Sequence, residues 1–126
     1  MSYITDIVLH LGTNAYDQEA IRQLHGFTWP SNSGNAYSFK DSPPTVVDLG
    51  DHHRTYGAPQ VGGYKVFTMK FLAGSYNYLD LDALVTHLRQ MKWRYPKEWV
   101  LVADVESLDS VSLFWQDGEK RGEMNP

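Results

Sequence analysis

Four side chains near the middle of the chain are of types that bind metal ions. They lie in the stretch DLGDHH and are Asp48, Asp51, His52 and His53. Carboxylate and imidazole groups at this short spacing can hold a divalent cation, and a bound cation can turn water into a nucleophile at neutral pH. The same stretch also has the composition of a solvated turn in which Asp51 caps a local bend. The sequence leaves both interpretations open.

No other pattern in the sequence nominates a catalytic residue. The chain has neither the G-x-G-x-x-G fingerprint nor the P-loop lysine of nucleotide-binding loops, and it has no G-x-S-x-G or H-E-x-x-H motif. It contains no cysteine, which excludes disulfides, thiolate metal ligands and thiol catalysis. These observations predict no cofactor and favour a protein that is not an enzyme.

Aromatic side chains gather in and beside the turn-rich stretch 28–63. Tyrosine and tryptophan combine a large contact area with a polar group, and both are enriched at interfaces. The core is expected to be filled by periodic apolar residues of other segments, which leaves these rings free to contact a partner. The alternative is that they cover the core of a small domain. The candidate binding residues are Trp29, Tyr37, Phe39, Tyr56 and Tyr64.

Composition indicates a folded protein with an acidic surface. The chain has 126 residues, of which 42% are hydrophobic and 21% are charged, so a single domain over residues 1–126 is expected. Its formal charge is −4, which argues against nucleic-acid binding because that requires a basic face. No apolar run approaches the roughly 18 residues of a membrane span, and the first residues lack a signal-peptide pattern. We therefore expect a cytoplasmic protein that does not bind membranes.

The elements that must position these residues follow from hydrophobic periodicity. Alternating residues predict strands, and turn residues separate them. Helical spacing predicts one helix capped by Asn14 and a second capped by Asn77, whose apolar stripe ends before Pro96. The strands are expected at 3–11, 64–71, 98–106 and 111–115, with shorter ones at 36–39 and 45–49.

This order of elements predicts an α+β fold. Two amphipathic helices and four to five strands must bury their apolar sides against each other. The expected result is a two-layer sandwich, in which both helices cover one face of an antiparallel or mixed sheet. A ferredoxin-like variant with an added strand near the C-terminus fits this order best. A loop-rich insertion occupies residues 28–63, and a polar tail occupies residues 117–126.

Several short motifs resemble those of a known group of proteins. They are SYITD (2–6), GGYKV (62–66), NYLDLDALV (77–85), KWRYP (92–96) and SLFWQDG (112–118). In this order they resemble a family of short proteins from actinobacteria and their phages, to which no activity is assigned. The resemblance covers most of the chain except residues 28–60. It implies a cytoplasmic setting and carries over no catalytic residue.

Three hypotheses about function remain. The leading one is a non-enzymatic binding or interaction module, which contacts a protein or small ligand through its aromatic loops. We expect it to be a homo-oligomer, because another surface such as a sister subunit would be needed to order the polar tail. The second is a small metal-assisted hydrolase or nucleotide-processing enzyme that uses the DLGDHH cluster. The third is a structural or host-directed phage protein.

Overall fold

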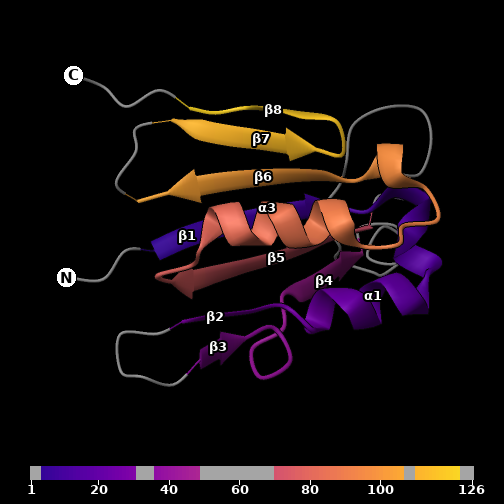
Figure 1. Cartoon of the computed structure of the whole chain (residues 1–126), viewed down its shortest axis with the longest axis horizontal. Coiled ribbons are helices and arrows are strands. Elements are labelled where there is room, and N and C mark those ends of the chain that lie inside the picture. The colour runs from indigo at the N-terminus through magenta and orange to yellow at the C-terminus, as the bar shows by residue number, and fades with distance from the viewer. Residues whose placement is uncertain (1–3, 31–35, 49–69, 107–109, 123–126) are drawn as a thin grey trace, which may run out of the picture.

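The computed structural model describes residues 4–30, 36–48, 70–106 and 110–122 of the chain. In this part of the chain the helices are α1 (Gln18–His25) and α3 (Leu81–Gln90), with two short 3-10 helices, η1 (Gly12–Tyr16) and η2 (Pro96–Glu98). The strands form a large sheet and a separate small hairpin (Figure 1). The predicted α+β class is therefore confirmed.

The large sheet has the strand order β4-β5-β1-β6-β7-β8, and every neighbouring pair is antiparallel. Its central strand β1 pairs with β5 on one side and with β6 on the other. The prediction of four to five strands was too low, because six strands pair in this sheet within the described residues. The strands are β1 (Ile4–His10), β4 (Thr45–Asp48), β5 (Lys70–Asn77), β6 (Val100–Val105), β7 (Val111–Trp115) and β8 (Gly118–Lys120).

Both helices begin later than the sequence suggested. The cap of α1 is Asp17, whose carboxylate accepts hydrogen bonds from the backbone N–H groups of the first turn. The cap of α3 is Asp80, which accepts from the N–H of Ala83 at 3.0 Å. The two predicted caps have other places: Asn14 belongs to η1, and Asn77 is the last residue of β5.

One face of the large sheet is buried. On β1 the residues Thr5, Ile7 and Leu9 are buried, whereas the residues between them are half-buried or exposed. α3 lies across this face (Figure 1), and its stripe of Leu84, Val85 and Leu88 is buried with it. Complete burial of such a side chain stabilises the fold by about 1.5–3 kcal/mol.

The small hairpin pairs β2 (Thr28–Pro30) with β3 (Ala36–Ser38) and closes one end of the core. Trp29 is only 2% exposed and Phe39 only 1%, and both rings contact Phe27 and Tyr76 or each other at centroid separations of 5.0–5.6 Å. The indole N–H of Trp29 donates to the backbone oxygen of Asn77 at 3.2 Å. These two rings are therefore core residues and present no surface to a partner.

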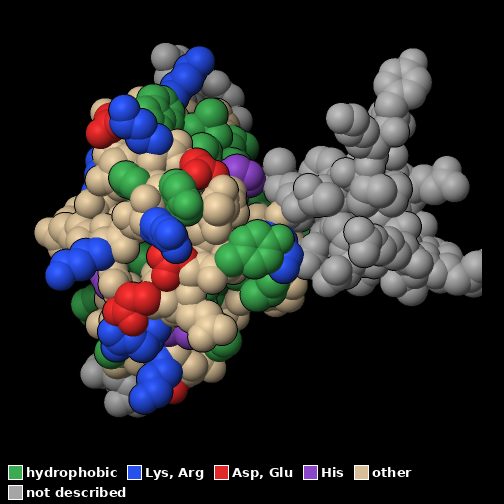
Figure 2. Space-filling view, turned by 90° about the vertical axis from the view of Figure 1, so that its right-hand side faces the viewer, with side chains coloured by type: hydrophobic (Ala, Val, Ile, Leu, Met, Phe, Trp, Pro, Cys, Tyr) green, Lys and Arg blue, Asp and Glu red, His purple; other side chains and the backbone are tan. Residues whose placement is uncertain are grey.

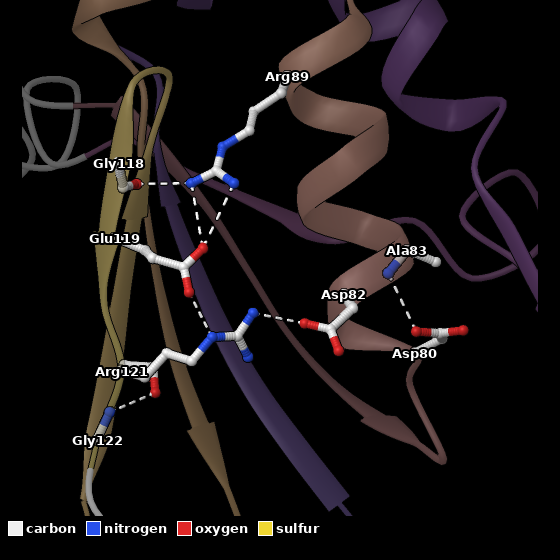
Figure 3. Close-up of polar contacts among 9 residues, drawn as sticks. Asp80, Asp82, Ala83, Arg89, Gly118, Glu119, Arg121 and Gly122 are labelled. Atoms are coloured by element: carbon white, nitrogen blue, oxygen red, sulfur yellow. Dashed lines mark hydrogen bonds and ion pairs between the residues drawn. The ribbon is translucent and has the colours of Figure 1, made fainter.

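The start of the expected polar tail is held by the rest of the chain. Gly118–Lys120 form the edge strand β8, and the guanidinium of Arg89 on α3 donates to the backbone oxygen of Gly118 at 2.7 Å (Figure 3). Arg121 in turn donates to the carboxylate of Asp82, also on α3, at 2.6 Å. A sister subunit is thus not required to order residues 118–122, because β7 and α3 already hold them.

Candidate interaction surface

The second face of the large sheet, which we call the open face, carries five of the nine large hydrophobic side chains that are exposed in the described part of the chain. Neither α1 nor α3 covers it, since their buried residues pack with the other face. The strand register arranges its side chains in three rows that run across the strands. Each row is named below by its residue on β1.

The Val8 row is apolar at its centre. Val8 lies opposite Ala73 of β5 and Val102 of β6, and Val102 lies opposite Leu113 of β7. Val8 is 38% exposed and Leu113 is 36% exposed, although both stand in the interior of a six-stranded sheet. Lys120 of β8 ends the row with a charge at the sheet edge.

The His10 row continues the apolar surface towards η2. It contains Phe71 of β5, Val100 of β6 and Trp115 of β7, and the Trp115 side chain is 38% exposed. The ring of His10 lies in the middle of this row and its Nδ1 is 3.1 Å from the backbone oxygen of Glu98. That hydrogen bond fixes the imidazole against the end of β6.

The Asp6 row is acidic. Asp6 and Asp104 lie directly opposite each other on neighbouring strands, and both are exposed. The hydroxyl of Ser75 donates to Asp6, and Glu106 accepts a hydrogen bond from the backbone N–H of Ile4 at 2.9 Å. Ile4, Asp6, Asp104 and Glu106 line a shallow pocket at this end of the face. The open face therefore has two largely apolar rows and a third row in which the carboxylates of Asp6 and Asp104 adjoin Val111.

The apolar part of this surface is concentrated and extended. Of the nine large hydrophobic residues that are exposed in the described part of the chain, the register places five on the open face. Val8, Leu113 and Trp115 lie in the two apolar rows, whereas Val111 lies in the Asp6 row and Ile4 lies beyond it, beside the carboxylates. From standard strand spacings, six strands and three rows span about 24 Å by about 14 Å between backbone positions. Contiguous apolar patches beyond a few hundred Å² mark interaction sites on soluble proteins.

At the end of the open face beside His10, Glu98 joins the segment before β6 to the segment after β1. Its carboxylate accepts from the backbone N–H of Thr13 at 2.9 Å and from the Thr13 hydroxyl at 2.8 Å. These two hydrogen bonds hold the pKa of Glu98 below its ordinary value, and the nearby imidazole of His10 adds to the effect. Gly12 has a φ of +60° there, and a Cβ at Gly12 would lie 2.7 Å from the Glu98 carboxylate oxygen. Only glycine fits this contact without displacing Glu98.

Another side of the molecule carries charged and hydrophobic side chains together (Figure 2). Figure 2 shows the side that faces right in Figure 1, where Lys and Arg side chains are interspersed with Asp and Glu. Mixed charges of this kind are typical of a solvated surface. No helix in the described part of the chain is long and apolar enough to cross a membrane.

The candidate site residues predicted from the sequence lie in different environments in the structure. Trp29 and Phe39 are buried, and Tyr37 stacks on Trp29 with 37% of its surface exposed. Asp48 is the last residue of β4, and its side chain lies outside what the structure describes. The remaining candidates also lie outside the described residues: Tyr56, Tyr64, Asp51, His52 and His53. Among the described residues, no three His, Asp or Glu side chains group as metal ligands would.

The open face was missed although the sequence contains a signal for it. Residues 4–10 have apolar residues at both alternating positions, Ile4 and Val8 on one side and Ile7 and Leu9 on the other. Residues 111–115 repeat this, since Val111, Leu113 and Trp115 alternate with Ser112 and Phe114. Two helices cover only one face of a sheet, so an apolar second face predicts a second packing surface.

Comparison of the chain with protein-family models, with curated proteins and with solved structures finds no match. The resemblance to short actinobacterial and phage proteins therefore stays a prediction.

Proposed function

We propose that the protein is a non-enzymatic interaction module that associates with a second copy of itself through the open face. The observation that carries this proposal is the row of Val8, Val102 and Leu113 on interior strands of the sheet, in which Val8 and Leu113 are exposed and Val102 is half-buried. Exposed valine and leucine there leave apolar surface in water, and burial against a second sheet recovers about 25 cal/mol per Å².

A second copy suits this surface because the surface is a sheet. Two antiparallel sheets pack face to face at about 10 Å with their inner side chains interdigitated. A dimer of this kind has the same patch on both subunits, so the patch must match itself. Two adjacent apolar rows meet that requirement, because each can cover the other.

We also propose a ferredoxin-like core in two layers. The elements β1, α1, β4, β5, α3 and β6 follow one another in the β-α-β-β-α-β order of such domains. The β2–β3 hairpin is then an insertion after α1, and β7 and β8 extend the sheet beyond β6. In a two-layer domain the helices occupy one face, which leaves the other face available for association.

The experiment compares solution masses by light scattering at micromolar protein concentration. We expect a dimer for the unmodified chain and a monomer for Leu113→Lys, because a lysine there places a charge in the centre of the interface. The matched control is Val46→Lys: Val46 is 64% exposed, and its register with Leu72 places it on the other face. This variant should remain a dimer.

Circular dichroism and urea unfolding must show that both variants are folded. Should Leu113→Lys fail to fold, Leu113→Thr supplies a polar replacement that suits a strand. An unmodified chain that is monomeric at 100 times the working concentration contradicts the proposal. So does a folded Leu113 variant that retains the mass of the unmodified chain.

A further inference from the structure

We infer that a cleft between η1 and the segment after α3 binds a small ligand that combines a planar aromatic ring with one anionic group, a phosphate or a carboxylate. This inference goes beyond the proposed function, because no residue that lines the cleft belongs to a strand of the large sheet. The cleft has a volume of about 390 Å³, within the range of about 300–1,000 Å³ that is usual for small-molecule sites. Its lining residues are Thr13, Tyr16, Asp17, Gln18, Arg94 and Tyr95.

Two segments of the chain line the cleft, and each contributes an exposed tyrosine. Tyr16, the last residue of η1, is 72% exposed, and Tyr95, just before η2, is 38% exposed. Four of the exposed large hydrophobic residues in the described part of the chain lie away from the open face, and these two tyrosines are half of them. Exposed aromatic rings are surfaces on which planar groups such as bases stack. The cleft therefore offers two stacking surfaces to one ligand.

Each of these tyrosines has a cation over its ring. The Nζ of Lys70, the first residue of β5, is 4.6 Å from the ring centroid of Tyr16. The guanidinium carbon of Arg94 is 5.8 Å from the ring centroid of Tyr95. Among the described residues Arg94 has no carboxylate partner, so its guanidinium is available to a phosphate or carboxylate of a ligand. A planar ligand that stacks on these rings thus brings its anionic group close to a cation.

The carboxylate of Asp17 determines which way the ligand lies. Its Oδ1 accepts from the backbone N–H groups of Glu19 at 3.1 Å and Ala20 at 3.3 Å. The negative charge of Asp17 repels an anion, so the anionic group of the ligand belongs at Arg94. Asp17 and the amide of Gln18 then remain for polar groups on the edge of the ring, and a few such groups give a small-molecule site its specificity.

The two segments are joined before any ligand binds. The side chain of Asn14 in η1 is fully buried and forms hydrogen bonds of 2.9 Å and 3.0 Å with the backbone of Tyr95. Glu98 accepts from both the N–H and the hydroxyl of Thr13, which joins the same segments a second time. Satisfied polar networks make a structure rigid. A site that is already in position loses less conformational entropy on binding, which favours affinity.

Isothermal titration calorimetry of the unmodified chain tests the ligand class. The ring-bearing anions are adenosine 5′-monophosphate and indole-3-acetate. We expect at least one of them to bind, one molecule per chain, with a Kd below about 1 mM, and the tighter one identifies phosphate or carboxylate as the anion. Adenosine and indole lack the anion, whereas inorganic phosphate and acetate lack the ring. Each of these partial ligands should bind at least about tenfold more weakly than the complete one.

Two variants test whether the ligand lies in the cleft. Arg94→Gln removes the cation and Tyr16→Leu removes one ring, and both side chains are exposed, so the fold should be retained. Each should raise the Kd at least about tenfold, because a charge-assisted hydrogen bond and a stacked ring each contribute a factor of that size. Arg22→Gln is the matched control, since it removes the same charge from an exposed pair with Glu19. Its Kd should stay within about twofold of the unmodified value.

Three results would overturn the inference. The first is a Kd above about 1 mM for both ring-bearing anions. The second is a partial ligand that binds as tightly as the complete one, since the site would then recognise only a ring or only an anion. The third is a Kd that either Arg94→Gln or Tyr16→Leu leaves unchanged, which would place the ligand outside the cleft. All three are independent of the solution mass, so the proposed association through the open face is tested separately.

Discussion

The side chain of Asn14 forms two hydrogen bonds with the backbone of Tyr95, one through each of its polar groups. Nδ2 donates to the Tyr95 carbonyl oxygen at 2.9 Å, and Oδ1 accepts from the Tyr95 N–H at 3.0 Å. Asn14 is fully buried, although the two residues are 81 positions apart in the chain. This contact ties η1, which leads into α1, to the segment that leads from α3 into β6. It therefore holds together the connection from β1 to α1 and the connection from α3 to β6.

Replacement of Asn14 is expected to destabilise the fold. Asn14→Ala leaves the N–H and C=O of Tyr95 without their partners and opens a small cavity, at a cost of about 2–4 kcal/mol. Urea unfolding measures the loss, and exposed Gln90→Ala serves as the control with a change below about 0.5 kcal/mol. An equal change in the free energy of unfolding for the two variants would show that the hydrogen bonds between Asn14 and Tyr95 do not stabilise the protein.

Trp29→Ala should act on stability, because its ring is buried among Phe27, Phe39 and Tyr76. We expect a loss of about 3–5 kcal/mol in the free energy of unfolding. Tyr37→Ala, which removes a half-exposed ring stacked on Trp29, should cost about 1 kcal/mol. A Trp29→Ala protein with unchanged stability would restore the view that this ring serves a partner.

Glu98 should make the fold sensitive to acid. Its pKa is lower in the folded chain than in the unfolded chain, because Thr13 donates two hydrogen bonds to the carboxylate. Its stabilising effect is thus complete above the ordinary pKa of 4.5 and is lost as the pH falls through the lower folded value. Glu98→Gln should flatten this part of the pH profile of unfolding. A profile that falls as steeply in Glu98→Gln as in the unmodified chain would refute this assignment.

Tyr76 should limit stability at the alkaline end. Burial raises the pKa of its phenol from 10.0 to about 12, and its hydroxyl donates to the backbone oxygen of Ser42 at 2.9 Å. The contribution is present below pH 10 and is lost as the pH rises through 12, because the unfolded chain releases the proton more readily. Tyr76→Phe should remove this alkaline loss. The difference in tyrosinate absorbance between the two proteins measures the pKa, and a midpoint near 10 would contradict the prediction.

Arg89 should control the attachment of β8. Its guanidinium donates to the backbone oxygens of Trp115 and Gly118, at 3.2 Å and 2.7 Å. Arg89→Met keeps the aliphatic stem and removes these bonds, at an expected cost of about 1–2 kcal/mol. Hydrogen exchange of the β8 amides should then accelerate. Arg22→Met is the matched control, since Arg22 forms only an exposed pair with Glu19 among the described residues. Unchanged exchange in Arg89→Met would place the attachment of β8 elsewhere.

Local patterns predicted several regular elements, but the bounds of β5 were wrong, since it extends over Lys70–Asn77 whereas the strand was expected at 64–71. The stripe of Leu84, Val85 and Leu88 indicated α3, alternating residues indicated β1, and a nearly continuous apolar run indicated β6. The strand after the predicted turn at 107–110 was expected as the partner of that run in a hairpin, and it is β7. The two short strands expected at 36–39 and 45–49 are also confirmed as β3 and β4. Side chains separated by two, three or four positions share a face of a strand or helix, so a short window contains this information.

The helix caps were wrong because two candidates competed within a few residues. Asn14 and Asp17 both have side chains that can accept from a free N–H group, as do Asn77 and Asp80. Asn14 forms its side-chain hydrogen bonds with Tyr95 and does not cap the helix, and Tyr95 is too distant in the sequence for a local pattern to include it. Asn77 does not cap a helix because it belongs to β5, where it pairs with Ile4 of β1.

The sequence by itself determined the class of fold, the amphipathic stripes of both helices and the apolar character of both faces of β1. Only the tertiary structure decided that Trp29 and Phe39 fill the core, that Gly118–Lys120 form an edge strand and that Val8 and Leu113 stay exposed. The physical reason is the range of the interactions. Periodicity records what neighbouring residues share, whereas burial depends on which distant segments pack together. The face of the large sheet against which α1 and α3 pack determines which of its two apolar faces is left uncovered.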